Sequence, residues 1–559
     1  MSAISALLLL LLITVVTSTY PISQDESYFK RYIDKDPNID MNGPNARTIS
    51  NLLGASNSPA KSSLNLSMIE VFLAQFITHD IERVNFNSTV YHTEVSPGDS
   101  VYGVNATNNF IRQELSVGQI FEGDEDDTRF ETRNFNTDAL DLSNIYGSDA
   151  ATHAALREFS LGKMKTSSYT IQLSPFFAVT YENMPPSQAV TNLTITTPIT
   201  SGPSTVFTAG DDRVNENIAL SIFDVVWVRN HNYHANLIGT ATPWLNDQQM
   251  FEAAAQKNRA DWQQIVMYEY VPTVLGSLAP LVKEYKGYDS DADIRTSVEF
   301  GMAAFRYGHS TVAQWDLIQA NGSVYVYTIP AGVFGPFPIS SSQLSFSGQL
   351  GGPQNPTQTF LLAGGIGNIV RGLVSGKADD SDIVFNNVAR NIVFGGSIGR
   401  AVDLLTLDIV RSRNSGTPNY YELRKKFFNI KGLEKDDANI YSSSLCTTKK
   451  DLVDDLSCFS LITSDITRAT LLQSIYGKVN KIDGIVGILS EDKYPGSLFS
   501  RTLGGILIKE YEQKRAGDVN WFENILDDAS LETVRTVKLS HIFRRNLNLP
   551  YLPENILVV

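Results

Sequence analysis

The stretch that most constrains this chain covers residues 71–83, with the sequence VFLAQFITHDIER. Its apolar residues recur at the spacing of one helix face, which predicts an amphipathic helix with a buried side. Gln75 and His79 lie four residues apart and share one side of that helix, whereas Asp80 points in another direction. Taken alone, His79 fits a hydrogen-bonded core histidine better than a catalytic base, so other stretches must decide between the two.

The composition is that of a large globular protein. Of its 559 residues 42% are hydrophobic, which is enough for a sizeable core, and the net charge of −15 argues against a nucleic-acid partner. Helical patterns cover most of the chain, without a repeat period or a glycine motif for a nicotinamide cofactor. We therefore expect a mainly α fold with few short strands: an extended arm at residues 20–63, then one large helical domain at residues 64–559.

The N-terminus and the sequons indicate the cell exterior. Residues 1–19 combine an apolar run with small polar residues, as a cleaved secretory signal peptide does, and the run is short for an uncleaved anchor, which needs about 20 apolar residues. No other stretch predicts a membrane span. Five N-x-[ST] sequons fit a secreted, extracellular glycoprotein; they lie at Asn65, Asn87, Asn105, Asn192 and Asn321.

Two cysteines occur in the sequence, Cys446 and Cys458. In an oxidising compartment they could close a small disulfide loop, and the alternative is a pair of free thiols.

Three further regions carry local expectations. Residues 85–127 are expected to be rich in loops, and residues 324–375, with many Pro, Gly and Ser residues, are expected to be irregular. The apolar pattern of residues 209–237 predicts a long helix. Arg213 and Glu216 lie three residues apart near its predicted start, where a structural ion pair is one explanation.

A loop at residues 137–143 carries oxygen atoms on alternate residues. Thr137, Asp141 and Ser143 have oxygen-bearing side chains, and Ala139 can offer its carbonyl. Such a set suits Ca²⁺, which takes six to eight oxygen ligands. The alternative is a turn that caps the helix expected at residues 150–161.

Six stretches share their sequences and their order with one known family. They are LAQFITHDIE, TDALDLSNIYGS, AGDDRVNE, FRYGHS, LDIVRSRNSGTPNYYELR and a C-terminal run from DGIVGILSED through DVNWFEN to LSHIFRRN. On these stretches the chain resembles the animal-type haem peroxidases of the peroxidase–cyclooxygenase superfamily, in particular peroxinectin-like secreted members. The resemblance implies a largely α-helical fold with haem b in the helical core.

The resemblance also implies roles on the distal side of the haem. His79 corresponds to the distal histidine, which moves a proton between the two oxygens of hydrogen peroxide. Arg213 corresponds to the distal arginine, which stabilises the charge that develops as the O–O bond breaks. Gln75 corresponds to the distal glutamine, which orders water or halide. The implied product is a ferryl haem that then takes electrons from a donor.

On the proximal side, His309 of the FRYGH sequence corresponds to the axial ligand of the haem iron. The family places an asparagine behind this histidine, whereas this sequence has Asp408. A carboxylate makes the imidazole more anionic, which favours high oxidation states of the iron; Asp408 could instead pair with a nearby arginine. Arg306 and Arg411 correspond to arginines that bind the haem propionates.

The family's calcium site adds Asp80, which follows the distal histidine, to Thr137, Ala139, Asp141 and Ser143. The family's two ester links to haem fall on Thr78 and Glu216 in this chain. Because threonine has no carboxylate, we expect at most one ester, through Glu216. The position of the family's sulfonium-forming methionine holds Asn217.

Together these features predict a secreted, hydrogen-peroxide-dependent oxidoreductase. Its expected donors are iodide, thiocyanate, phenols or tyrosine, and contact with the extracellular matrix or a cell surface is an additional expectation. One alternative is a fatty-acid dioxygenase of the same superfamily, which uses a tyrosine three residues before the proximal histidine. That position is Arg306, and Tyr307 is one residue nearer. The other alternative is an adhesion or matrix protein that keeps the fold without turnover.

Overall fold

The computed structural model describes residues 27–33, 41, 43–56, 58–99, 110–122, 128–175, 177–193, 204–313, 315–329, 357, 360–361, 363–391, 403–428 and 455–559. The predicted signal peptide at residues 1–19, the sequon at Asn105 and Cys446 lie outside these residues.

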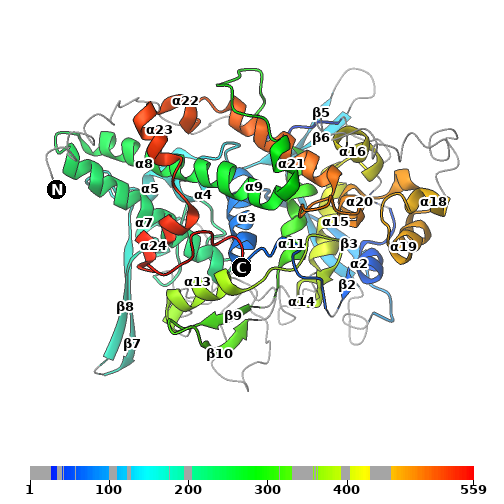
Figure 1. The fold of residues 1–559 in the computed structure, drawn as a ribbon, viewed down its shortest axis with the longest axis horizontal. Helices are drawn as coiled ribbons and strands as arrows, with labels where there is room; N and C mark the ends of the chain where they lie inside the picture. Colours follow the sequence, from blue (N-terminus) through cyan, green and yellow to red (C-terminus); the bar gives the residue numbers. More distant parts are fainter. Residues whose placement is uncertain are drawn as a thin grey trace.

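Helices account for most of the described secondary structure, as expected (Figure 1). The α-helices are α2 (Ala46–Leu53), α3 (Met68–Ile81), α4 (Ser143–Tyr146), α5 (Ala150–Leu156), α6 (Gln188–Thr191), α7 (Ile218–Ala241), α8 (Asp247–Ile265), α9 (Val271–Leu275), α10 (Val298–Gly301), α11 (Gly308–Thr311), α13 (Ile366–Ser375), α14 (Asn387–Asn391), α15 (Leu404–Asn414), α16 (Tyr420–Phe427), α18 (Leu456–Phe459), α19 (Ile466–Tyr476), α20 (Gly484–Ser490), α21 (Arg501–Gly517), α22 (Phe522–Ile525), α23 (Asp528–Val534) and α24 (Leu539–Leu547). The described residues also contain a π-helix, η1 (Val266–Tyr270), and three 3₁₀-helices, η2 (Gly276–Leu281), η3 (Ala304–Tyr307) and η6 (Val479–Lys481).

The strands are short and form small sheets at the periphery. They are β1 (Ser27–Tyr28), β2 (Ala55–Ser56), β3 (Phe86–Glu94), β4 (Phe110–Ser116), β5 (Gly118–Glu122), β6 (Thr128–Asn134), β7 (Ser167–Ser174), β8 (Phe177–Met184), β9 (Trp315–Ile318), β10 (Val324–Ile329) and β11 (Phe385–Asn386). β3 pairs with β4, β7 with β8 and β9 with β10, each antiparallel, while β1, β6 and β5 form a three-stranded sheet and β2 pairs parallel with β11.

Helix α3 forms the centre of the molecule. It lies between the α7–α8 pair on one side and α11, α15 and α21 on the other (Figure 1). Apolar residues on nearly every side of it are buried, and Phe76 stacks on Phe223 of α7 and meets Trp262 of α8 edge-on. A helix that is apolar almost all round has to be a core helix, which explains why its few polar side chains are buried with it.

The expected extended arm contains a helix. Helix α2 lies within residues 20–63 and buries Ile49 and Leu53, while the Asn45 side chain accepts a hydrogen bond from the Thr48 backbone N–H at its start. This cap and the apolar spacing are ordinary helix signals, and the surrounding polar residues obscured them in the sequence.

Two regions expected to be irregular contain regular elements, so these expectations are wrong in detail. Residues 85–127 contain β3, β4 and β5, and residues 324–375 contain β10 and α13. Segments such as FNSTVYHTE are rich in β-branched and aromatic residues, which favour strands once a partner strand is available. Neighbouring polar residues weaken the pattern that would reveal them.

Helix α7 begins at Ile218 rather than at residue 209, because Asn217 caps it by accepting a hydrogen bond from the Leu220 backbone N–H. Arg213 and Glu216 therefore lie in the turn before the helix and not within the helix as predicted. Similarly, α5 ends at Leu156, earlier than the predicted residue 161.

The sequons within the described residues lie on the surface: Asn65, Asn87, Asn192 and Asn321 are all exposed. Cys458 is buried, and its pairing with Cys446 stays a prediction. Among the described residues, no helix is long and apolar enough to span a bilayer.

Candidate functional site

The distal histidine candidate lies on the inner side of α3. His79 is buried, and Gln75 is one turn earlier on the same helix. Burial lowers the pKa of His79 well below the usual histidine value, and the nearby Arg213 guanidinium lowers it further. The imidazole is therefore neutral near pH 7, which is the form that can accept a proton.

A chain of hydrogen bonds connects the start of α7 to His79. Asn217 Nδ2 donates to Gln75 Oε1 over 2.8 Å, and Gln75 Nε2 donates to Glu216 Oε2 over 3.0 Å. The same Glu216 oxygen lies 3.5 Å from His79 Nε2. Burial raises the pKa of Glu216, although Arg213 counteracts this effect. The structure thus brings together three of the predicted site residues: Gln75, His79 and Glu216.

Arg213 is held by Asp211 in a two-point ion pair. Arg213 Nε donates to Asp211 Oδ1 over 2.8 Å and Nη2 donates to Asp211 Oδ2 over 2.6 Å, while Nη2 also donates to the Glu82 carbonyl over 2.9 Å. The pair raises the pKa of Arg213 and lowers that of Asp211. Arg213 Nη1 has no hydrogen-bond partner among the residues that the structure describes, so it remains available to a ligand.

Asn136 connects this ion pair to α3. Its Nδ2 donates to the His79 backbone carbonyl over 2.5 Å and lies 3.1 Å from Asp211 Oδ2. Asn136 is buried and directly precedes Thr137 of the predicted calcium loop. One amide group therefore connects the loop, the distal histidine and the carboxylate that holds Arg213.

The proximal candidate, His309, lies on α11 and faces Asp408 of α15. His309 Nδ1 and Asp408 Oδ2 are 2.6 Å apart, and Asp408 is buried. The contact fixes the ring and leaves Nε2 without a hydrogen-bond partner in the described part of the chain. The alternative pairing of Asp408 with Arg411 is much weaker, since Arg411 Nη1 is 3.9 Å from Asp408 Oδ1.

Arg306 and Arg411 form a cationic pair next to this histidine. Arg306 donates to Glu82 and to the Gly301 carbonyl, the latter over 2.8 Å. Arg411 Nε is buried and has no hydrogen-bond partner among the described residues, and burial together with the charge of Arg306 lowers the pKa of Arg411 to about 10. An anionic group placed here would satisfy this incompletely paired cation.

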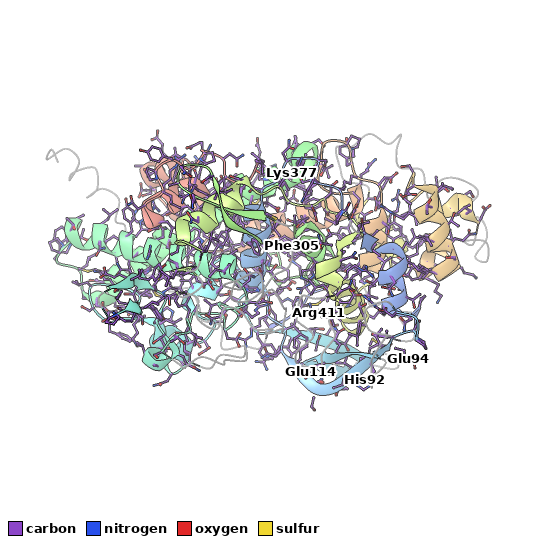
Figure 2. The ribbon with its side chains drawn as sticks, turned by 90° about the horizontal axis from the view of Figure 1, so that it is seen from below. His92, Glu94, Glu114, Phe305, Lys377 and Arg411 are labelled. Atoms are coloured by element: carbon purple, nitrogen blue, oxygen red, sulfur yellow. The ribbon has the colours of Figure 1, made fainter. Side chains whose placement is uncertain are left out.

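Figure 2 places Arg411 between Phe305 in the interior and the β3–β4 hairpin, which carries His92, Glu94 and Glu114 at the edge of the molecule. The guanidinium carbon of Arg411 lies 5.6 Å from the ring centre of Phe86 on that hairpin. The hairpin, which the sequence analysis missed, thus covers one side of the cationic pair.

The distal and proximal residues face the same interior space. Burial raises the pKa of Glu216, and His309 is among the groups that oppose this rise, so the two side chains lie within reach of each other's electrostatic influence. Both keep 29% of their side-chain surface accessible although they lie deep in the fold. A methyl group added at Gly308, next to His309, would meet nothing within 4 Å. Open space, an imidazole nitrogen without a hydrogen-bond partner among the described residues, and an incompletely paired arginine together fit haem with its iron and its propionates.

Behind the proximal histidine lies a second buried network. Tyr307 donates to Glu70 Oε1 over 2.8 Å, and its hydroxyl is 2.5 Å from that of Tyr270. All three side chains are completely buried, and burial raises the pKa of Glu70 to about 7. The contact joins α3, which carries the distal residues, to η3, which leads into the proximal histidine.

The predicted calcium residues gather next to the distal helix. Asp80 Oδ1 accepts from the Ser143 backbone N–H over 2.6 Å, the Ser143 hydroxyl donates to the Asp80 carbonyl over 2.5 Å, and Thr137 donates to Asp141 over 2.7 Å. Asp80 and Asp141 are buried, and the charge of Asp141 adds to the effect of burial in raising the pKa of Asp80. Two buried carboxylates among hydroxyl and carbonyl oxygens are the ligand chemistry of Ca²⁺. Within the described ranges no cluster of three or more His, Cys, Asp or Glu side chains suits a metal, so calcium stays a proposal.

Comparison with known proteins decides the family. The sequence profile described as Animal haem peroxidase matches residues 27–557. The chain belongs to the animal haem peroxidase family. This membership implies haem binding and confirms the predicted family and its helical fold.

Individual members of the family are similar over part of their length. Peroxinectin A of Dictyostelium discoideum is 27% identical over 353 residues, which cover 63% of this chain and 57% of that protein. Dual oxidase 1 of Caenorhabditis elegans is also 27% identical, over 61% of this chain and 21% of that protein. The chain thus spans less than two thirds of these relatives.

Solved structures show the same fold. Peroxidase A from Dictyostelium discoideum superimposes with a TM-score of 0.75 and 22% identity, covering 96% of both chains. A fatty acid alpha-dioxygenase from Oryza sativa gives a TM-score of 0.69 with 16% identity, covering 96% of this chain and 84% of the dioxygenase. At these identities the likeness concerns the fold alone.

Several residues of the site have contacts that could not be predicted from the sequence. Asp211 and Asn136 hold Arg213 and His79, Glu82 pairs with Arg306, and Asn217 contacts Gln75. Asp211 lies two residues from Arg213, and this spacing was the available signal. The contacts of Asn136 and Glu82 join positions far apart in the chain, so no local pattern could indicate them.

Proposed function

We propose that the protein is a haem peroxidase, which reduces hydrogen peroxide and oxidises a small electron donor. The observation that carries the proposal is the arrangement around one interior space: a neutral His79 with Gln75 and Arg213 on one side, and His309, held by Asp408, on the other. When bound, haem would supply the iron that binds peroxide and would hold the oxidising equivalents delivered by peroxide until the donor supplies electrons.

His79 is the proton carrier. Because its imidazole is neutral, it can take the proton from one peroxide oxygen and deliver it to the other, which turns the leaving oxygen into water. The Asn136 bond to its backbone carbonyl and its place on the rigid core helix keep the ring in position. Loss of this base should cost a factor of about 10²–10⁴ in the rate of reaction with peroxide.

Arg213 supplies positive charge to the distal side. The two-point contact with Asp211 fixes the guanidinium plane, and Nη1 stays available to negative charge that develops on the departing oxygen. Gln75 adds a second donor group beside His79.

His309 is the proposed iron ligand through Nε2. Because Nδ1 contacts Asp408, Nε2 points away from the carboxylate. The same contact makes the ring a stronger electron donor. Arg411 and Arg306 are the proposed partners of the propionates.

The attachment of haem is proposed to involve at most one ester, through Glu216. Thr78 at the other position is engaged with the Ala74 carbonyl through its hydroxyl and has no carboxylate. Extraction of peroxide-treated enzyme with acidified organic solvent tests this: retained haem in the wild type and its loss in Glu216→Gln support the link. Complete extraction from the wild type rejects it.

We further propose that the protein binds Ca²⁺ through Asp80, Thr137, Ala139, Asp141 and Ser143, and that it is secreted and glycosylated. Support for secretion comes from the leader-like residues 1–19 and from the four exposed sequons. The proposed donors are iodide, thiocyanate, phenols or tyrosine side chains. Matrix or cell-surface contact is proposed on the resemblance to peroxinectin-like secreted proteins. Turnover assays with each of these donors test the proposed donor preference.

The dioxygenase alternative has weaker support. The position three residues before the proximal histidine holds Arg306, which is engaged with Glu82, and the adjacent Tyr307 directs its hydroxyl to Glu70 and Tyr270. Oxygen uptake with a fatty acid and no peroxide would favour the dioxygenase. A protein that binds haem yet consumes neither peroxide nor oxygen would favour the adhesion alternative.

A further inference from the structure

Asn217 has two hydrogen-bonding contacts that together fix the direction of its amide group. Its Oδ1 accepts from the Leu220 backbone N–H over 2.8 Å, as the cap of α7. A backbone N–H can only donate, so the oxygen of Asn217 must face the helix. Its Nδ2 group must then face the other way, where Gln75 Oε1 lies 2.8 Å away.

The direction of the Asn217 amide in turn fixes the direction of the Gln75 amide. Because its oxygen accepts from Asn217, its Nε2 group faces the interior space, where it donates to Glu216 over 3.0 Å next to His79. The direction of the whole chain is therefore set by one backbone N–H of helix α7. Without Asn217, Glu216 alone would orient the Gln75 amide, and a carboxyl group can accept when ionised or donate when protonated, so it fixes the orientation less firmly than a backbone N–H does.

We propose that Asn217 is a positioning residue that makes Gln75 a hydrogen-bond donor, and never an acceptor, toward small anions and oxygen ligands bound in the distal space. The inference rests on the proposed function, since it takes this space to be the distal side of the haem. It deepens that function by assigning a ligand preference: acceptor ligands such as halide ions are favoured through Nε2 of Gln75. Asn217 is buried, so it acts through Gln75 and does not itself meet the ligand.

The Asn217→Asp variant separates orientation from folding. Aspartate caps helices as well as asparagine does, so α7 keeps its start. Its second carboxylate oxygen can only accept, which favours a turned Gln75 amide with Nε2 toward Asp and the oxygen toward the ligand. In that orientation Glu216 has to carry a proton to bond the Gln75 oxygen. The added negative charge also repels anions, and that effect has to be measured by itself.

The experiment uses the full haem-loaded chain with two probes. Fluoride is titrated into the ferric protein, and the C–O stretching frequency is recorded for the carbon monoxide complex of the reduced protein. A donor facing bound carbon monoxide lowers this frequency and an acceptor raises it. For Asn217→Asp we expect a fluoride Kd raised by about tenfold or more and a higher C–O frequency.

The control is the same substitution in a Gln75→Leu background. There the amide is absent, so Asn217→Asp should raise the fluoride Kd and shift the C–O frequency only by the smaller amounts due to charge. Equal effects in both backgrounds would overturn the proposal, because charge alone would then explain them. An unchanged C–O frequency in the single Asn217→Asp variant would overturn it as well.

The outcome is distinguishable from a failure of the proposed function. A wild type that binds haem and fluoride but does not react with peroxide rejects the peroxidase and still allows the comparison of variants. A wild type that takes up no haem rejects both.

Discussion

His309 Nδ1 and Asp408 Oδ2 lie 2.6 Å apart, with the carboxylate buried and the histidine at the edge of the interior space. The resemblance to the family leads to the expectation of a neutral asparagine at this position. A buried carboxylate draws the Nδ1 proton more strongly and raises the electron donation from the other ring nitrogen, which in turn stabilises ferric over ferrous iron.

We therefore predict that Asp408→Asn raises the midpoint potential of the Fe(III)/Fe(II) couple in the haem-loaded protein. Spectroelectrochemical titration measures it directly. The control is Asp403→Asn, which alters another buried aspartate of the same region that pairs with Arg47. A potential that falls or does not move in Asp408→Asn would contradict this role.

The ion pair of Asp211 with Arg213 leads to a second prediction. Asp211→Asn replaces a two-point carboxylate with an amide that has one acceptor, so the guanidinium loses its fixed plane. We expect the rate of reaction with peroxide to fall by about tenfold to a hundredfold, measured by stopped-flow absorption. Asp212→Asn is the matched control, because its side chain pairs with Arg83 at 3.0 Å. Similar rates in both variants would show that the Asp211 contact has no role in the reaction.

The proposed calcium site makes the distal helix sensitive to metal removal. Treatment with EDTA should shift the haem absorption spectrum and lower the thermal midpoint, because Asp80 immediately follows His79 and its carboxylate lies among buried oxygens. Asp141→Ala should reproduce both effects without the chelator. Ser88→Ala, on the exposed part of β3, keeps the Asn87 sequon and should respond to EDTA as the wild type does. Metal-free protein with full peroxide reactivity would rule out this site.

The buried Glu70 makes stability depend on pH. Its pKa is raised from an ordinary 4.5 to about 7, so the folded protein holds this proton more tightly than the unfolded chain does. The stabilisation is complete below the ordinary carboxyl pKa and is lost as the pH rises through about 7, amounting to at most about 3 kcal/mol. Burial raises the pKa of Glu299 and Glu269 to about 7 too, so they contribute in the same direction.

Chemical denaturation at about pH 5 and about pH 8 tests this account of Glu70. The free energy of unfolding should fall between the two conditions in the wild type and fall less in Glu70→Gln. The exposed Glu532→Gln should behave as the wild type does. A pH dependence that Glu70→Gln leaves unchanged would exclude Glu70 as a source.

The sequence allowed prediction of the residues that lie on regular elements. Gln75 and His79 follow from the spacing of one helix, and the contact of His309 with Asp408 follows from the family motifs. The position of Glu216 could not be predicted in the same way, because α7 starts nine residues later than expected, at Ile218 instead of residue 209, and leaves Glu216 in a turn.

Contacts between segments that are distant in the chain could not be predicted from the sequence either. Asn136 reaches the His79 carbonyl across 57 positions, and the β3–β4 hairpin covers Arg411 although its residues were expected to form loops. Such contacts depend on how the elements pack, and a period or a spacing in one segment carries no information about them.

The most direct test of the account is the absorption spectrum of the haem-loaded protein before and after an equimolar addition of hydrogen peroxide. The account predicts a ferric haem spectrum that changes rapidly on mixing, returns when iodide or a phenol is added, and changes far more slowly in His79→Ala. A haem spectrum that peroxide leaves unchanged in the wild type would contradict the peroxidase assignment.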